Sequence, residues 1–96
     1  WVLTGIDIQN TKTHTVSRLD CDGVFIAIGR IPNTTLFAEQ LPLDDYGFIP
    51  ADESTQTVVP GVFAIGDVRT KALRQIVTAA ADGATASHYV EQYLAK

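Results

Sequence analysis

The hydrophobic and polar positions along the chain predict a β-hairpin followed by two buried strands. Residues 2–8 and 13–19 are short runs rich in β-forming side chains, separated by a polar cluster at residues 9–12. This arrangement is typical of two antiparallel strands joined by a turn. Residues 24–28 and 58–65 are apolar without alternation, which is the pattern of strands covered on both faces of a parallel sheet.

The longest predicted element is a helix near the end of the sequence. Small and apolar residues recur there at helical spacing over about five turns; they are Ile76, Ala79, Ala80, Gly83, Ser87, Val90 and Leu94. Glycine in a helix interior costs roughly 1 kcal/mol relative to alanine, so we expect Gly83 to lie in a close contact. Weaker signals predict a turn of helix at Thr34 or Thr35 and a short strand at residues 48–50.

A domain change is expected near residue 31. Residues 29–33 contain Pro32, which fixes its own φ angle and disfavours the helical region for Ile31. The strand at residues 24–28 is therefore expected to end there, and residues 32–96 are expected to begin a second structural unit.

The motif with the clearest chemical meaning is Gly66-Asp67, which ends the second apolar run, with Arg74 and Gln75 at the head of the helix. A carboxylate that directly follows a buried parallel strand lies at the sheet edge where open α/β folds bind nucleotides. Asp67 would accept hydrogen bonds from the hydroxyl groups of a sugar-like chain. The helix amino terminus, which carries about half an elementary positive charge, would face the rest of the ligand. The pattern favours a flavin site, and the structural alternative is an ordinary turn that stops a buried strand.

Composition and charge narrow the classes of function. The chain has 96 residues, 46% of them hydrophobic, and a net charge of -4. This composition is typical of a soluble globular protein, and the acidic balance argues against nucleic acid and acidic membranes as partners. No signal peptide or membrane-spanning run is visible, so we expect the cytoplasm. His14 and His88 are isolated, and Cys21 lies between two acids, so the sequence predicts no metal site and no catalytic residue.

Three ordered blocks resemble the C-terminal part of bacterial thioredoxin reductases, which are flavoproteins that use NADPH to reduce a disulfide. They are GVFIAIGRIPNT at residues 23–34, VPGVFAIGDV at residues 59–68 and LRQIVTAA at residues 73–80. The resemblance implies an α/β chain with a partial FAD/NAD(P)-binding Rossmann-like fold. Residues 1–31 would close the pyridine-nucleotide domain, and residues 32–96 would form the C-terminal segment of the FAD-binding domain.

The resemblance also implies a site and partners. The flavin contacts would be Gly66, Asp67, Arg74, Gln75 and Ile76, with the Gln75 and Ile76 amides near the pyrimidine edge. The intact enzyme would use FAD and NADP, act on thioredoxin or another disulfide protein, and form a homodimer.

The chain by itself is expected to be inactive. It has one cysteine and no G-x-G-x-x-G motif, whereas the resembled enzymes need a Cys-x-x-Cys pair and two such fingerprints. It begins at Trp1 without methionine or a basic leader, so we expect a start inside a longer protein. The alternatives are a related reductase, such as the flavoprotein subunit of an alkyl hydroperoxide reductase, or a cofactor-free α/β interaction module.

Overall fold

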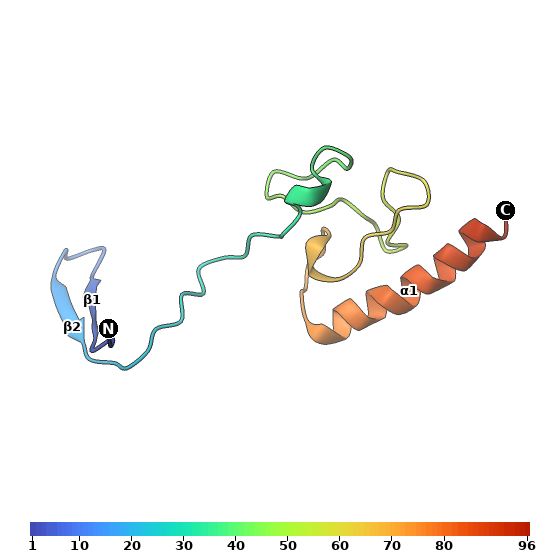
Figure 1. Ribbon diagram of the computed structural model, residues 1–96. Coiled ribbons are helices and arrows are strands. Elements are labelled where there is room, and N and C mark those ends of the chain that lie inside the picture. The colour runs from blue at the N-terminus through green and yellow to red at the C-terminus, as the bar shows by residue number, and fades with distance from the viewer. The chain divides into compact units, whose positions relative to one another are not determined.

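The computed structural model describes all 96 residues, and they form two compact units, Trp1–Arg30 and Ile31–Lys96. The first unit contains strands β1 (Ile6–Gln9) and β2 (Val16–Leu19). The second contains two turns of 3-10 helix, η1 (Thr35–Phe37) and η2 (Gly66–Val68), and the helix α1 (Ile76–Leu94). Figure 1 shows these elements along the chain.

The predicted hairpin is confirmed, with shorter strands than expected. β1 and β2 pair antiparallel, with Ile6 opposite Leu19 and Gln9 opposite Val16. The Asn10 carboxamide closes the connection by accepting hydrogen bonds from the backbone N–H groups of Lys12 and Thr13, at 2.8 and 3.0 Å. Side-chain capping of this kind is the reason that asparagine favours turns.

The predicted buried strand at residues 24–28 is wrong for this chain. These residues form no strand, and the side chains of Phe25 and Ile28 are 99% and 94% exposed. A buried parallel strand needs strands beside it and helices over both faces. The first unit has only the two strands of the hairpin, so the apolar run has nothing to pair with inside it.

The predicted buried strand at residues 58–65 is also wrong. The chain turns at Pro60 and Gly61, and the segments on either side pair with each other. The Thr57 N–H donates to the Val62 carbonyl at 3.0 Å, and the Ala64 N–H donates to the Thr55 carbonyl at 2.8 Å. Because no parallel neighbour is available, this local antiparallel pairing satisfies the backbone instead.

A small core lies in the second unit. Leu41, Ile49 and Ala64 are buried, and they are packed by the partly buried Leu43, Ala51, Val59 and Val68. The strand expected at residues 48–50 is reduced to one parallel bridge between Ile49 and Arg69. The expected helical turn is present as η1. The core is therefore built from turns and isolated bridges, and the Rossmann-like parallel sheet expected from the sequence is not formed within this chain.

The C-terminal helix is confirmed as α1, but its packed face differs from the predicted one. Ile76, which the periodicity places inward, is 91% exposed, whereas Asp82 and Ala86 are buried. The buried face thus includes a charged residue, whereas the apolar pattern alone predicts that charged residues face solvent. No helix of this chain combines the length and the apolar character that crossing a membrane requires.

Two glycines of the second unit are expected to respond in opposite ways to alanine. Gly61 has a φ of 80°, and a Cβ there would lie 3.1 Å from the Tyr93 ring. Gly61→Ala should therefore lower the free energy of unfolding by about 1–2 kcal/mol. Gly83 has no atom within 4 Å of an added Cβ, so the close contact expected for it is wrong. Gly83→Ala should raise stability by roughly 0.8–1 kcal/mol through helix propensity. Urea unfolding followed by circular dichroism compares the two, and equal effects would contradict this difference.

Candidate functional site

The Gly66-Asp67 motif forms the turn η2. Gly66 is buried with a φ of 73°, a left-handed conformation that glycine adopts without steric cost. A Cβ at this position would meet the Ala79 Cβ at 3.6 Å, which is ordinary contact. The backbone conformation, more than lack of space, therefore explains the glycine. Asp67 follows at an exposed position of the same turn.

The start of α1 lies against this turn and uses some of its own amides. Gln75 is the extended N-cap residue, and its N–H donates to the Thr78 hydroxyl at 3.0 Å. The Gln75 amide is therefore already engaged inside the chain. The Ile76 amide belongs to the first helical turn, whose N–H groups have no carbonyl partner within a helix.

Arg74 connects the turn to the helix start. Its Nε donates to the Asp67 carbonyl and its Nη2 to the Arg69 carbonyl, both at 3.2 Å. The guanidinium carbon also lies 3.8 Å from the centre of the Phe48 ring, which is cation–π geometry. The structure thus gives Arg74 a role in holding residues 67–69. Of the five residues expected to contact flavin, Gly66, Asp67 and Arg74 are brought together by these contacts.

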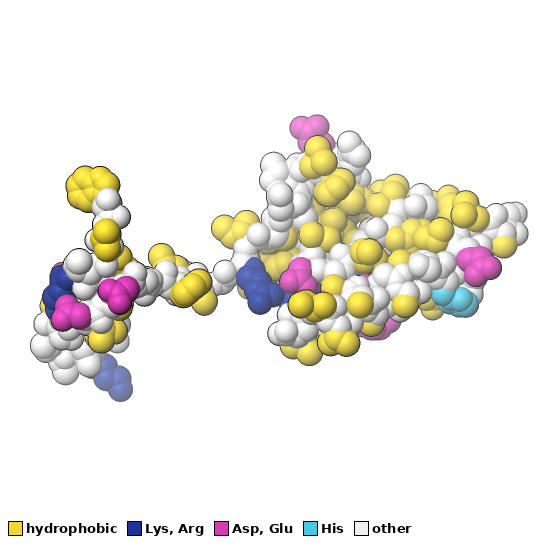
Figure 2. Space-filling model, turned by 60° about the horizontal axis from the view of Figure 1, so that its bottom comes forward, with side chains coloured by type: hydrophobic (Ala, Val, Ile, Leu, Met, Phe, Trp, Pro, Cys, Tyr) yellow, Lys and Arg dark blue, Asp and Glu magenta, His cyan; other side chains and the backbone are white.

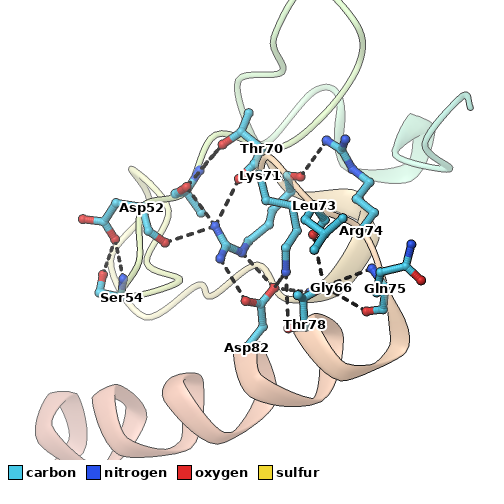
Figure 3. A network of polar contacts seen from close by, with 12 residues as sticks. Asp52, Ser54, Gly66, Thr70, Lys71, Leu73, Arg74, Gln75, Thr78 and Asp82 are labelled. Atoms are coloured by element: carbon cyan, nitrogen blue, oxygen red, sulfur yellow. Dashed lines mark hydrogen bonds and ion pairs between the residues drawn. The ribbon is translucent and has the colours of Figure 1, made fainter.

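A buried ionic network lies beneath the turn, and Figure 3 shows it from close by. The Asp82 carboxylate of α1 forms a two-pronged pair with Arg69, with Nε to Oδ2 and Nη2 to Oδ1 both at 2.9 Å. Lys71 Nζ lies 2.7 Å from Oδ2, and the Gly66 N–H donates to the same oxygen at 2.8 Å. The three side chains expose only 8% (Asp82), 4% (Arg69) and 8% (Lys71) of their area.

The network joins three parts of the second unit. Arg69 Nη1 donates to the carbonyls of Ala51 and Asp52, each at 3.3 Å. Lys71 Nζ also donates to the Thr78 carbonyl of α1 at 3.3 Å. Residues 51–52, residues 66–71 and the first two turns of α1 are therefore tied to one carboxylate.

This network was not predicted from the sequence. Asp82 is the one charged residue among the small residues in the first half of α1, and Arg69 and Lys71 precede it by 13 and 11 residues. A lone acid on the face of a helix rich in alanine was the available signal. This signal identifies Asp82, but its partners Arg69 and Lys71 can be named only when the position of the turn η2 is known.

The surroundings of Asp82 favour its ionised form. The Arg69 guanidinium lowers the pKa of the Asp82 carboxyl well below its usual range, and Lys71 and the Gly66 amide add to this effect against the opposing effect of burial. The carboxylate in turn raises the pKa of Arg69. The Asp82–Arg69 pair is therefore ionised at neutral pH.

Acid should weaken the second unit through this carboxyl. Because the pKa is lower in the folded chain than in the unfolded one, the stabilisation is complete above about pH 4 and is lost as the pH falls further. We expect the urea midpoint of the wild-type chain to fall steeply between about pH 4 and pH 2. Asp82→Asn should begin with a lower midpoint and change little over that range. Equal acid sensitivity of the two proteins would contradict this role of Asp82.

The remaining sequence candidates show no built site. Cys21 is a half-buried free thiol. The structure gathers no group of three or more His, Cys, Asp or Glu residues that could hold a metal ion. The candidate site therefore consists of η2, the start of α1 and the network beneath them.

Comparison with known proteins gives consistent matches. The sequence profile of the pyridine nucleotide-disulphide oxidoreductases matches residues 3–83. The chain is 50% identical over 95 residues to the thioredoxin reductase of Rickettsia prowazekii and covers 31% of it. It is 45% identical over 96 residues to that of Schizosaccharomyces pombe, covering 30%.

Solved structures agree with these sequences. The crystal structure of Lactococcus lactis thioredoxin reductase matches with a TM-score of 0.86 and 35% identity, over 96% of this chain and 30% of that one. The T. acidophilum thioredoxin reductase matches with a TM-score of 0.89 and 34% identity, over 97% of this chain and 31% of that one. The chain thus spans about a third of the length of these relatives and has part of their fold. It belongs to the pyridine nucleotide-disulphide oxidoreductase family.

Proposed function

We propose that this chain is the C-terminal portion of a thioredoxin-reductase-like flavoprotein, where it supplies contacts to the ribityl chain and pyrimidine edge of FAD. In the complete cytoplasmic, homodimeric enzyme, electrons would pass from NADPH through FAD to a disulfide of thioredoxin or a similar protein. Residues 1–31 would close the pyridine-nucleotide domain and residues 32–96 the FAD-binding domain. The likeness to thioredoxin reductases over nearly the whole chain supports this proposal.

One observation carries the assignment of the site: Arg74 binds the Asp67 and Arg69 carbonyls and so joins the Gly66-Asp67 turn to the start of α1. These two features offer complementary chemistry. An exposed carboxylate accepts hydrogen bonds from the hydroxyl groups of a ribityl chain. The helix amino terminus favours negative charge, as at the pyrimidine edge of flavin. The residues at this site therefore fit the ribityl chain and the pyrimidine edge of FAD.

The contacts divide among the site residues according to their bonds in the structure. Asp67 would hold the ribityl hydroxyls, and Gly66 gives the turn its left-handed backbone. The Gln75 N–H is engaged by Thr78, so we assign the pyrimidine edge to the Ile76 amide and the exposed Gln75 side chain. Arg74 would act by holding the turn. FAD, when bound, would supply the two-electron chemistry that links NADPH to the disulfide.

A chimera tests the Asp67 assignment. This chain would replace the matching stretch of the Lactococcus lactis thioredoxin reductase, with which it shares 35% identity. Asp67→Ala should weaken FAD binding by roughly 10- to 100-fold, because a hydrogen bond to a charged acceptor contributes about 1.5–3 kcal/mol. The measurement is the FAD dissociation constant from flavin fluorescence. Asp45→Ala, which removes an exposed acid elsewhere in the same unit, is the matched control. Equal FAD affinities of the two variants would refute the role of Asp67.

A further inference from the structure

The turn that carries Asp67 is hydrogen-bonded to one oxygen atom of α1, Oδ2 of Asp82. Asp82 Oδ2 accepts three hydrogen bonds, from the Gly66 N–H at 2.8 Å, from Arg69 Nε at 2.9 Å and from Lys71 Nζ at 2.7 Å. These donors all belong to the segment that contains the turn, and Figure 3 shows Gly66 and Lys71 beside the Asp82 carboxylate. The position of the Gly66 amide is therefore tied to the position of this oxygen.

The hydrogen bond from Gly66 to Asp82 matters because of the backbone conformation of Gly66. Its φ of 73° is one of several conformations that glycine adopts readily, so the residue does not by itself select the observed turn. The bond from its amide to Asp82 joins residues 16 positions apart and favours the observed conformation over the others. The direction in which the next residue, Asp67, leaves the turn depends on that selection.

We propose that Asp82 is a positioning residue for flavin, fixing through the Gly66 amide the turn from which Asp67 reaches the ribityl chain. This inference rests on the proposed function of the Gly66-Asp67 turn. Asp82 itself does not reach the ligand, since its carboxylate is buried and is occupied by Arg69, Lys71 and Gly66. Its effect passes through the backbone of the turn.

Lys71 provides a comparison that separates positioning from general stabilisation. Lys71→Gln removes one cation from the network but leaves both the Arg69 pair and the Gly66 bond to Asp82. This variant should lose stability while it keeps the turn. Asp82→Asn should lose both, because the amide is a weaker acceptor and disturbs the pair with Arg69. Asp82→Glu keeps the charge and moves the carboxylate by one methylene, so it tests the geometry if Asp82→Asn does not fold.

The first arm of the test is amide hydrogen exchange of Gly66, measured by NMR on the full 96-residue chain. Asp82→Asn and Asp82→Glu should speed this exchange by about tenfold or more, as expected for the loss of a bond to a charged acceptor. Lys71→Gln should leave it unchanged while lowering the urea midpoint. Unchanged Gly66 exchange in a folded Asp82 variant would overturn the inference.

The second arm measures FAD affinity in the chimera with Lactococcus lactis thioredoxin reductase. Asp82→Glu should weaken FAD binding by about tenfold, and Lys71→Gln should leave it unchanged. A parallel loss of FAD affinity in both variants would show that affinity follows stability alone, and would overturn the positioning role. If Asp67→Ala leaves FAD affinity unchanged, the proposed function fails instead, and the exchange of Gly66 still decides whether Asp82 fixes the turn.

Discussion

Asp82→Ala is expected to destabilise residues 31–96 by about 3–5 kcal/mol, the usual cost of removing one partner from a buried ion pair. The change leaves the Arg69 and Lys71 cations buried without their carboxylate, and it removes the acceptor of the Gly66 N–H. A unit of this size has a thin stability margin, so most of the variant should be unfolded at neutral pH. Loss of the α1 signal in far-ultraviolet circular dichroism measures the effect.

Two further variants show whether the charge pairing is the cause. Glu91→Ala removes an exposed acid from the same helix and should change stability by less than about 0.5 kcal/mol. Replacing Arg69, Lys71 and Asp82 together by apolar residues should recover much of the lost stability, because no uncompensated charge is then buried. If Asp82→Ala unfolds at the wild-type urea midpoint, the network contributes nothing to the fold.

The isolated chain is expected to associate with itself at micromolar concentration. Both units expose large apolar side chains, including Phe25 and Ile28 in the first and Val58 and Leu73 in the second. Figure 2 shows hydrophobic side chains over much of the visible surface. The second unit also has an apolar hollow of about 230 Å³ lined by Phe37, Leu41, Ile49, Val62, Phe63, Ala64, Ile65 and Val68. Exposed apolar side chains gathered in this way favour association with another surface.

A closed two-fold dimer is the expected product, because it buries the same surface on both copies. The unpaired run at residues 24–28 offers a backbone edge for pairing as well as apolar side chains. Light scattering after size exclusion measures the mass. Ile26→Lys should shift the population toward monomer, whereas Lys12→Glu, in the hairpin turn, should not. A well-folded monomer of the wild-type chain at micromolar concentration would contradict the prediction.

Local patterns in the sequence predicted the elements that local interactions form. The hairpin follows from β-forming runs and the Asn10 turn, and α1 follows from the spacing and composition of residues 76–94. The two apolar runs, residues 24–28 and 58–65, predicted strands that this chain does not form. Their composition is that of strands in a parallel sheet, and composition alone does not say whether the neighbouring strands are present.

The part of the candidate site that lies in local sequence motifs was predicted, and the part that depends on contacts between distant residues was not. The Gly66-Asp67 turn and the start of α1 are visible as a motif, and the structure brings them together through Arg74. The bond between the Gln75 amide and Thr78 follows from helix capping, which a search for ligand contacts overlooked. Asp82 and its two cations are distant in sequence, and burial of a charge becomes favourable only once its partners are placed. The positions of these partners are known only from the tertiary structure.

The FAD content of the purified chimera with Lactococcus lactis thioredoxin reductase decides whether this chain supplies contacts to flavin. If this chain supplies the ribityl and pyrimidine contacts of a reductase, the purified chimera should retain bound FAD, with the visible absorbance of an enclosed flavin. Asp67→Ala should release that flavin on dialysis, and Asp45→Ala should not. A folded chimera that is purified without FAD, and does not take it up when FAD is added, would refute the proposed flavin contacts.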